Sequence, residues 1–231
     1  MKLSVIIPVF NEERTIDTVI DRVKGTSLPG GVEKEIVIVN DGSTDGTARH
    51  LEKYQADSWL KIFHQEKNQG KASAVVLGIQ QSTGDIIIIQ DADLEYDPND
   101  YARLIQPIID GKYAVVYGSR FLGKIENMTF INRLANIITR VTFNILYGTK
   151  MTDVNTCYKI IRKDILKDIT LQAQHFGIDT EITAKIIKKG YPILEIPIHY
   201  KARTKQEGKK IDWAKALKLY WVLIKLRFIR T

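Results

Sequence analysis

The chain has 231 residues, of which 44% are apolar and 26% charged, and this composition suits one globular domain with a sizeable core. Its single cysteine, Cys157, excludes an internal disulfide and is compatible with a reducing cytosol. No run approaches the roughly 18 uncharged apolar residues of a spanning helix, and the opening MKLSVIIPVF resembles a strand rather than a signal peptide. A membrane would therefore be contacted from its surface.

The net charge of +7 is concentrated at the end of the chain. Residues 200–231 hold ten lysines and arginines against two acids, a balance of 10 − 2 = +8, so the rest of the chain sums to 7 − 8 = −1. A basic tail predicts an anionic partner there, which is a membrane, a nucleic acid or a phosphorylated substrate.

The first 120 residues alternate short β-branched runs with helical stretches. Strands are predicted at Leu3–Val9, Glu35–Asn40, Leu60–His64, Asp85–Gln90 and Lys112–Gly118. Helices are predicted at Glu12–Lys24 (capped by Asn11), Asp45–Tyr54, Lys71–Gln81 and from Asp97-Pro98 to about Asp110. This alternation predicts an α/β domain with a mostly parallel sheet and right-handed crossovers.

The second half is less regular. Asn127–Tyr147 reads as a helix, Met151–Arg162 as an extended or hairpin segment, and Ile178–Lys189 as an amphipathic helix. Tyr191–Tyr200 has prolines near both ends, which suits an edge strand, and Asp212–Arg230 is predicted to be a basic amphipathic helix.

Polar, turn-forming residues follow four of the predicted strands, at the carboxyl edge where such sheets bind ligands. Asp91-Ala92-Asp93, with Glu95 close behind, follows the all-apolar strand. Carboxylates at alternate positions can converge on one hard cation, so this cluster predicts a Mg²⁺ or Mn²⁺ site completed by substrate phosphates. The alternative is a solvated acidic turn.

The first turn, Pro8–Glu12, contains no glycine, which argues against a dinucleotide fingerprint or a P-loop, and so against a dehydrogenase or a kinase. Asp41, at another strand end, can accept a hydrogen bond from the ring N–H of a base. It can equally stabilise its own turn.

Four motifs in order then carry a resemblance. Val5–Glu13 (VIIPVFNEE), Val39–Thr47 (VNDGSTDGT), Asn68-Gln69-Gly70-Lys71 and Gln90–Glu95 (QDADLE) resemble family 2 glycosyltransferases of the GT-A fold. Tyr117-Gly118-Ser119-Arg120 is similar to the branch that makes dolichyl-phosphate mannose and glucose. The resemblance implies a Rossmann-like sheet flanked by helices, and inverting transfer from a UDP- or GDP-sugar with Mg²⁺ or Mn²⁺.

The resemblance also implies roles for single residues. The expected nucleotide-binding residues are Pro8, Asn11, Glu12, Asp41, Lys71 and Asp91. The expected metal ligands are Asp91, Asp93 and Glu95. Mannose synthases typically have glutamine at the position of Glu95, so the donor stays open between UDP-glucose, UDP-N-acetylglucosamine and GDP-mannose.

A polyprenyl phosphate is the expected acceptor. A phosphate monoester is mostly dianionic at neutral pH, so it needs positioning and neutralisation rather than a general base. Guanidinium grips phosphate bidentately, so its predicted ligands are Arg120, Arg133, Arg140 and Arg203. The predicted catalytic residues are Asp91, Asp93, Arg120, Asp179 and Arg203.

Two other functions remain open. A hydroxyl acceptor on a glycan or glycolipid would require a base, for which Asp179 is the candidate. A non-catalytic basic module that binds membrane or nucleic acid would use the tail, but it leaves the acidic cluster unexplained.

The expected organisation is a catalytic domain over 1–211, with a nucleotide-sugar half (1–120) and an acceptor half (121–211), and a basic amphipathic helix over 212–231. That helix carries an aromatic and aliphatic stripe among lysines, which suits an anionic membrane surface or docking on the protein's own core. The 127–147 segment is a candidate for a second interfacial helix. We expect a peripheral protein on the cytoplasmic face of a membrane, without nucleic acid, and with a membrane-anchoring subunit or a homo-oligomer as further partner.

Overall fold

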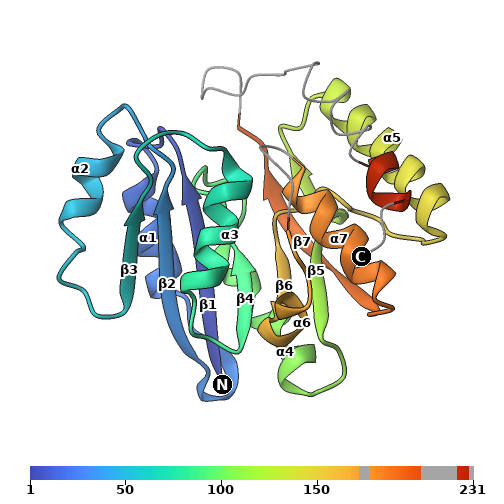
Figure 1. Cartoon of the computed structure of the whole chain (residues 1–231), viewed down its shortest axis with the longest axis horizontal. Helices are drawn as coiled ribbons and strands as arrows, with labels where there is room; N and C mark the ends of the chain where they lie inside the picture. Colours follow the sequence, from blue (N-terminus) through green and yellow to red (C-terminus); the bar gives the residue numbers. More distant parts are fainter. Residues whose placement is uncertain (172–176, 204–222, 229–231) are drawn as a thin grey trace.

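The computed structural model describes residues 1–171, 177–203 and 223–228, and Figure 1 shows one sheet covered by helices. The strands lie in the order β3-β2-β1-β4-β6-β5-β7. β6 is antiparallel to β4 and β5, and the other pairs are parallel, so the mostly parallel α/β sheet is confirmed. The strands are β1 Lys2–Val9, β2 Glu33–Asn40, β3 Leu60–His64, β4 Ile86–Ile89, β5 Val115–Glu126, β6 Lys159–Arg162 and β7 Ile193–Lys201.

Helices cover both faces of the sheet because successive strand side chains point to opposite sides. Leu3, Val5 and Ile7 of β1 pack in one core cluster with α1 (Ile16–Gly25), α2 (Thr47–Glu52) and α4 (Tyr101–Ile109). Ile6 packs on the other face, in a cluster with α3 (Lys71–Gln81), α5 (Phe130–Tyr147), α6 (Lys163–Lys167) and α7 (Ile178–Lys188). Single 3₁₀ turns occur at Pro29–Gly31 and Pro98–Asp100.

The central strand β4 is buried on both sides, as its uninterrupted isoleucines predict. Ile86 and Ile88 belong to the first cluster, Ile87 and Ile89 to the second, and all four are at most 1% exposed. Asp91 and Asp93 therefore follow a strand that is buried on both faces of the sheet. β7 forms one edge of the sheet, as the prolines of 191–200 predict.

Two local predictions were wrong, and one short helix was missed. Helix α1 begins at Ile16 rather than after an Asn11 cap, because the Asn11 side chain bonds Thr44 instead. β5 continues to Glu126, because it resumes pairing with β7 after a register shift between Ser119 and Lys124. The short helix α6 was not predicted.

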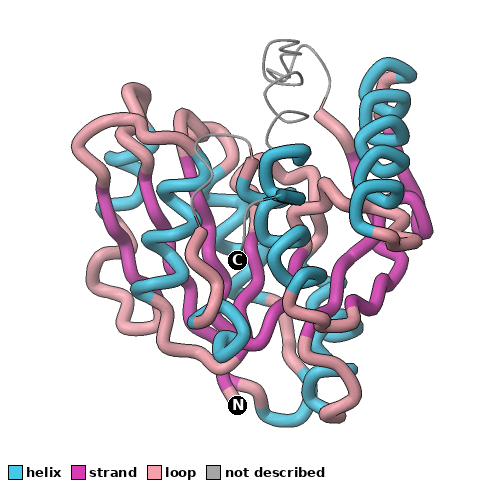
Figure 2. Tube along the Cα trace, turned by 45° about the vertical axis from the view of Figure 1, so that its right-hand side comes forward, coloured by secondary structure: helices cyan, strands magenta, loops and turns pink. Residues whose placement is uncertain are grey.

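Most of the predicted 212–231 helix lies outside the described residues, but 223–228 is helical and contacts α5. Tyr147 donates its hydroxyl to the carbonyl of Leu223, and Arg227 donates to the carbonyl of Leu146. Figure 2 shows α5 at the periphery of the molecule. In the described part of the chain, no helix has the length and apolar character needed to cross a bilayer.

Candidate active site

The loops that follow β1, β2, β3 and β4 meet at one edge of the sheet, the upper edge in Figure 1. The end of β7 reaches the same edge, because Lys201 donates its amide to the carbonyl of Glu95 (3.0 Å) and Tyr200 forms a bridge with Tyr96. The polar segments predicted to form a site are thus gathered in one place, together with residues from near the end of the chain.

Strand β1 and the loop after it carry three of the predicted nucleotide residues. Pro8 is buried in β1, opposite Val39. Asn11 adopts a left-handed conformation (φ 56°) and accepts the amide of Thr44 at 2.8 Å. Glu12 directs its carboxylate to Arg203, at 2.9 and 3.0 Å. The loop is therefore tied both to the β2–α2 loop and to the end of β7.

Asp41 anchors the neighbouring loop. Its two carboxylate oxygens accept the backbone amides of Gln69 (2.7 Å) and Gly70 (2.8 Å), and the residue is 2% exposed. Gly42 has a φ of 65°, and a Cβ there would lie 2.5 Å from the carbonyl carbon of Lys67, so only glycine fits this approach. The turn-stabilising role of Asp41 is present in the structure, and its contact with a base stays a prediction.

Lys71 lies between two carboxylates. Its Nζ is 2.7 Å from Asp91 Oδ1 and 3.6 Å from Asp179 Oδ2, and 3.1 Å from the sulfur of Cys157. Burial would lower the pKa of Lys71, but Asp179 and Asp91 outweigh it and hold that pKa well above its ordinary value. Lys71 is therefore a permanent cation at the centre of the site.

Asp179, the candidate base, starts α7 beside this cluster. Its Oδ1 is buried and has no hydrogen-bond partner within the described residues. Buried carboxylate oxygens are normally satisfied, so an orphaned one suggests a place for a ligand.

Arg203 provides the second cation. Its guanidinium pairs with Glu12 and lies 3.4 Å from Asp93 Oδ2, so it bridges the first loop and the acidic loop. Burial would lower the pKa of Arg203, but Asp93 and Glu12 raise it. Arg203 was predicted to bind the acceptor phosphate. In the structure it neutralises the acidic side of the site.

The pKa values of the two aspartates of the acidic loop are shifted in opposite directions. Burial would raise the pKa of Asp91, but the Lys71 ammonium outweighs it and holds the pKa below its ordinary value. Burial, followed by the carboxylates of Asp91 and Glu95, raises the pKa of Asp93 to about 7. The site thus carries more negative charge than its own cations neutralise.

This charge excess fits a divalent cation. In the described part of the chain, no three His, Cys, Asp or Glu side chains are grouped so as to hold a metal on their own. Magnesium and manganese need only one or two protein carboxylates when substrate phosphates complete the shell. Asp91 and Asp93 are the residues that fit this role.

Glu95 is engaged elsewhere. Its Oε2 accepts the hydroxyl of Tyr200 (2.5 Å), and its Oε1 accepts the amide of Arg203 (2.7 Å). These two hydrogen bonds connect the end of β7 to the acidic loop. Glu95 as a metal ligand stays a prediction, and binding metal would require it to leave these donors.

Arg120 is buried (6% exposed) and forms a bidentate pair with Asp153, at 2.7 and 2.8 Å. Its guanidinium also lies over the ring of Tyr200. A buried ion pair of this kind ties β5 to the segment before β6, and the contact of Arg120 with the acceptor phosphate stays a prediction. The other two predicted phosphate ligands, Arg133 and Arg140, lie on α5, where Arg133 is exposed.

Two residues at the site escaped prediction. Cys157, which was considered above only for disulfide formation, donates its thiol to Asp91, 66 residues away. Tyr200 was assigned only to an edge strand. Neither residue belongs to a motif, and both are brought here by sheet order, so no local signal could have found them.

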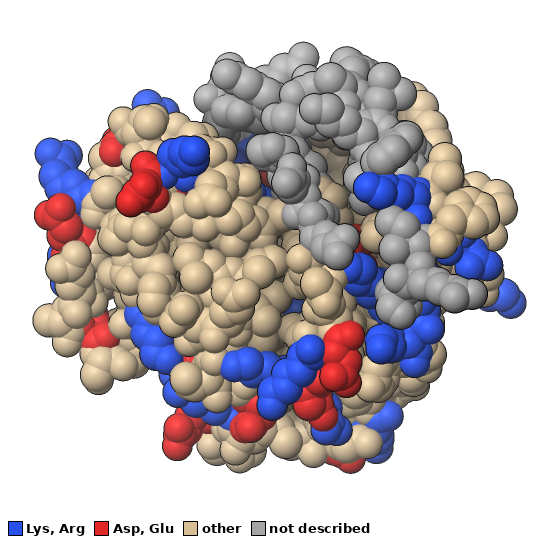
Figure 3. All heavy atoms as spheres, in the orientation of Figure 1, with Lys and Arg blue, Asp and Glu red and all other residues tan. Residues whose placement is uncertain are grey.

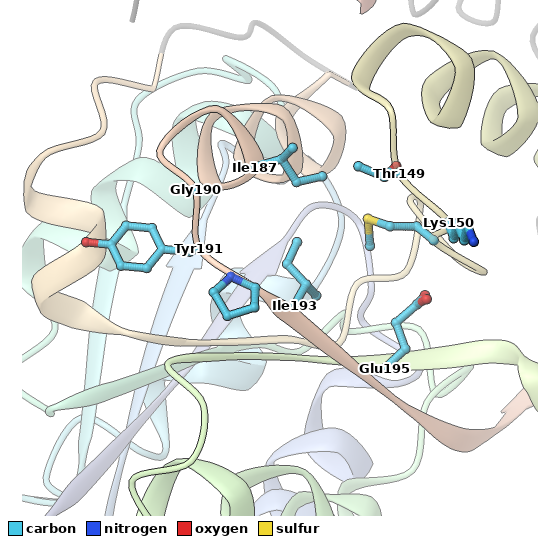
Figure 4. A pocket seen from close by; sticks show the side chains of 9 residues that line it. Thr149, Lys150, Ile187, Gly190, Tyr191, Ile193 and Glu195 are labelled. Carbon is cyan, nitrogen blue, oxygen red and sulfur yellow. The ribbon is translucent and has the colours of Figure 1, made fainter.

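Figure 4 shows a separate pocket of about 400 Å³, lined among others by Met151, Ile187, Tyr191 and Ile193. It lies where β7 begins, whereas the acidic site lies where β7 ends. The carboxylate of Glu195, which lines this pocket, accepts hydrogen bonds from the amide and hydroxyl of Thr152 and from the amide of Asp153. This pocket is therefore distinct from the candidate site.

Comparisons with known proteins agree with this architecture. Dolichol-phosphate mannosyltransferase from Pyrococcus furiosus is 30% identical over 216 residues, which cover 90% of this chain and 59% of the relative. Dodecaprenyl-phosphate galacturonate synthase from Rhizobium johnstonii is 27% identical over 75% of this chain and 52% of its own length. The chain thus spans somewhat more than half the length of these curated relatives.

Solved structures show the same fold. Glucosyl-3-phosphoglycerate synthase from Mycobacterium tuberculosis, in complex with Mn²⁺, UDP and phosphoglyceric acid, has a TM-score of 0.77 at 18% identity, covering 100% of this chain and 80% of that one. S. aureus TarS with UDP-GlcNAc has a TM-score of 0.69 at 20% identity, covering 98% and 66%. The model of glycosyl transferase family 2 matches residues 4–170. The chain belongs to glycosyl transferase family 2 and has its GT-A fold.

Proposed function

We propose that this chain transfers a hexose, with inversion, from a UDP- or GDP-sugar to a polyprenyl phosphate at a membrane surface, with Mg²⁺ or Mn²⁺. The observation that carries this is the geometry of the acidic loop after β4, where Lys71 lies 2.7 Å from Asp91 and Arg203 lies 3.4 Å from Asp93. An acidic site with cations at its rim is suited to a metal-bound diphosphate.

A divalent cation, held by Asp91 and Asp93, would supply charge stabilisation for the departing nucleoside diphosphate. The acceptor phosphate oxygen bonds to the anomeric carbon from one face, and the bond from that carbon to the diphosphate breaks on the other. The electron pair of the broken bond leaves on the diphosphate. Lys71 and Arg203 are placed to neutralise phosphate oxygens during this exchange.

The names of the curated relatives support a lipid phosphate acceptor, because one contains dolichol phosphate and the other dodecaprenyl phosphate. The Mn²⁺, UDP and UDP-GlcNAc named with the structural neighbours support a metal and a nucleotide sugar. We further propose that residues 1–120 form the nucleotide-sugar half and residues 121–211 the acceptor half, and that the protein is peripheral at the cytoplasmic face of a membrane.

The test is a transfer assay with UDP-glucose, UDP-N-acetylglucosamine or GDP-mannose, detergent-dispersed polyprenyl phosphate and Mn²⁺. We expect one donor to yield a glycosylated lipid phosphate, and Asp93→Asn to reduce the rate by about 100-fold or more. Undiminished transfer by Asp93→Asn would contradict the assignment of the metal site.

A second candidate is transfer to a hydroxyl, favoured by the orphaned Oδ1 of Asp179. A hydroxyl acceptor needs a base, so Asp179→Asn would then lose turnover by a factor of about 10² to 10⁴. With a lipid phosphate acceptor, the same variant should stay within about tenfold of the unaltered protein, because the dianion needs no base. Measuring both variants with both acceptor types separates the two candidates.

A further inference from the structure

The acidic loop, residues 91–95, is held by buried side chains that take no part in the proposed chemistry. Gln90 directly precedes the loop and is 1% exposed. Its side-chain oxygen accepts the hydroxyls of two fully buried tyrosines, Tyr101 (2.6 Å) and Tyr158 (2.7 Å). Its side-chain nitrogen donates to the carbonyl of Asp91 (2.9 Å). One amide group thus connects the acidic loop to the start of α4 and to the segment before β6.

Only one orientation of the Gln90 amide satisfies all three partners. A carbonyl oxygen accepts two hydrogen bonds, so both tyrosine hydroxyls can donate to it. If the amide were turned over, its oxygen would face the carbonyl oxygen of Asp91, and neither of the two could donate. The side chain therefore fixes the peptide group that follows Asp91, and it is too deeply buried to touch a substrate itself.

Other contacts hold the rest of the loop. Thr15, immediately before α1, donates its hydroxyl to the carbonyl of Ala92 (2.7 Å), so two successive carbonyls of the loop are bound by side chains. Leu94 has a φ of 61°, a left-handed conformation that is unfavourable for a bulky residue, and its side chain packs against the core. Beyond the loop, the ring of Tyr96 lies 4.7 Å from the ring of Tyr158. Tyr158 therefore contacts the residues on both sides of the loop.

The acidic loop needs to be held because its carboxylates repel one another. The acidic side chains visible in Figure 3 gather at the lower centre and the left of this face, on the surface of the molecule. The side chains of Asp91 and Asp93 are instead only 19% and 16% exposed. Water screens like charges less in such a place, so without a fixed backbone the two carboxylates would move apart.

We infer that Gln90 is a positioning residue, which fixes the backbone of the acidic loop so that Asp91 and Asp93 can bind a metal-bound diphosphate without rearrangement. A buried polar network whose members are all bonded makes its surroundings rigid. A side chain that orients the ligands of a metal typically changes metal affinity by about 10- to 100-fold. The inference rests on the proposed function, which assigns the metal to Asp91 and Asp93 but names nothing that orients them.

The test compares Gln90→Met with the unaltered chain by calorimetric titration of UDP and of GDP in the presence of Mn²⁺, and by urea unfolding. Methionine keeps the length of the side chain and removes all three of its hydrogen bonds. We expect the affinity for the nucleotide that binds with Mn²⁺ to fall about tenfold or more. The urea midpoint should fall as well, because two buried hydroxyls lose their acceptor.

A triple variant separates positioning from folding. Gln90→Met combined with Tyr101→Phe and Tyr158→Phe removes the two hydroxyls that Gln90→Met leaves without an acceptor, so the urea midpoint should rise again. The nucleotide affinity should stay as low as in Gln90→Met, because the Asp91 carbonyl is unheld in both variants. An affinity that recovers together with the stability would show that Gln90 serves only the fold, and would overturn the inference. An unchanged affinity in Gln90→Met would overturn it too.

Ser4→Ala is the matched control. It removes a buried hydrogen bond to Glu35 (2.6 Å) toward the opposite edge of the same sheet. It should lower the urea midpoint and leave the nucleotide affinity unchanged, and an equal loss of affinity in Ser4→Ala and Gln90→Met would attribute the effect to stability alone.

Sugar transfer to polyprenyl phosphate is measured separately from these affinities. An unaltered chain that binds nucleotide with Mn²⁺ but transfers no sugar would contradict the proposed function, while the affinities of the variants would still decide the role of Gln90. An unaltered chain that binds neither UDP nor GDP with Mn²⁺ would contradict both.

Discussion

Lys71 is the cation that lies between two carboxylates of the site, 2.7 Å from Asp91 and 3.6 Å from Asp179. If it is replaced by methionine, Asp91 loses its ion pair and the pKa of its carboxyl should rise, because the ammonium is what holds it down. We expect transfer by Lys71→Met to fall about 100-fold at neutral pH and to recover partly as the pH is raised. The measurement is kcat/KM against pH for the variant and the unaltered chain.

Lys71→Arg is the matched control, because it keeps the charge while changing the geometry. It should retain more activity than Lys71→Met and show the unaltered pH profile. A methionine variant with transfer within threefold of the unaltered chain would exclude Lys71 from the chemistry.

Arg120 shows how a motif residue can serve the fold. Methionine at this position would leave Asp153 buried (2% exposed) and without its cation, which costs about 3–5 kcal/mol of unfolding free energy. Adding Asp153→Asn should recover part of that loss, because an amide needs no counter-ion. Urea unfolding of both variants measures this. A stable Arg120→Met with a raised KM for the lipid acceptor would instead support the predicted phosphate contact.

At the scale of elements, Glu35 ties β2 to β1 and to the turn before β4. Its carboxylate accepts from Ser4 (2.6 Å) and from the amide and hydroxyl of Thr83, and Lys2 lies 3.0 Å away. Burial would raise the pKa of Glu35, but these donors outweigh it and hold the pKa far below its ordinary 4.5. The carboxylate therefore stabilises the strand ends only while it is ionised.

The sign of the pH effect follows from this shift. A carboxyl with a depressed folded pKa gives its full stabilisation above its unfolded pKa of about 4.5, and loses it as the pH falls further. Glu35→Gln should cost about 2–3 kcal/mol at pH 7, and the gap to the unaltered chain should narrow below pH 4.5. Urea unfolding from pH 7 to pH 3 checks this, and a gap that does not change with pH would contradict the assignment.

The elements themselves were largely readable from the sequence. β3 and α3 occur at their predicted residues, and the four isoleucines of β4 predicted its burial. The place of β6, antiparallel between β4 and β5, could not be predicted, because pairing depends on contacts between distant segments rather than on local pattern. The prediction that Asn11 caps the first helix was wrong for a related reason, because its side chain bonds Thr44 on another loop.

At the scale of the whole molecule, the candidate site was predictable in part. Motif residues such as Asp91 and Asp93 follow strand ends, and the rule for ligand sites in parallel sheets gathers them. Arg203 pairs with Glu12, and Cys157 with Asp91, because the order of the strands brings segments that are far apart in the sequence to the same edge of the sheet. Sequence reasoning thus gave the acidic half of the site and missed how its charges are balanced.

The balance of charge across the site makes a prediction about the stability of the whole molecule. A ligand that binds only the folded state raises the free energy of unfolding by about 2.7 kcal/mol at 100 times its Kd, which for a chain of this size is about 5–10 °C in Tm. We expect UDP or GDP to give such a shift only when Mn²⁺ is present, because the carboxylates of Asp91 and Asp93 repel a bare diphosphate. Differential scanning fluorimetry with each nucleotide, with and without Mn²⁺, measures it. Asp93→Asn should abolish the dependence on Mn²⁺, and an equal shift by nucleotide alone would show that the acidic loop does not bind the diphosphate through a metal.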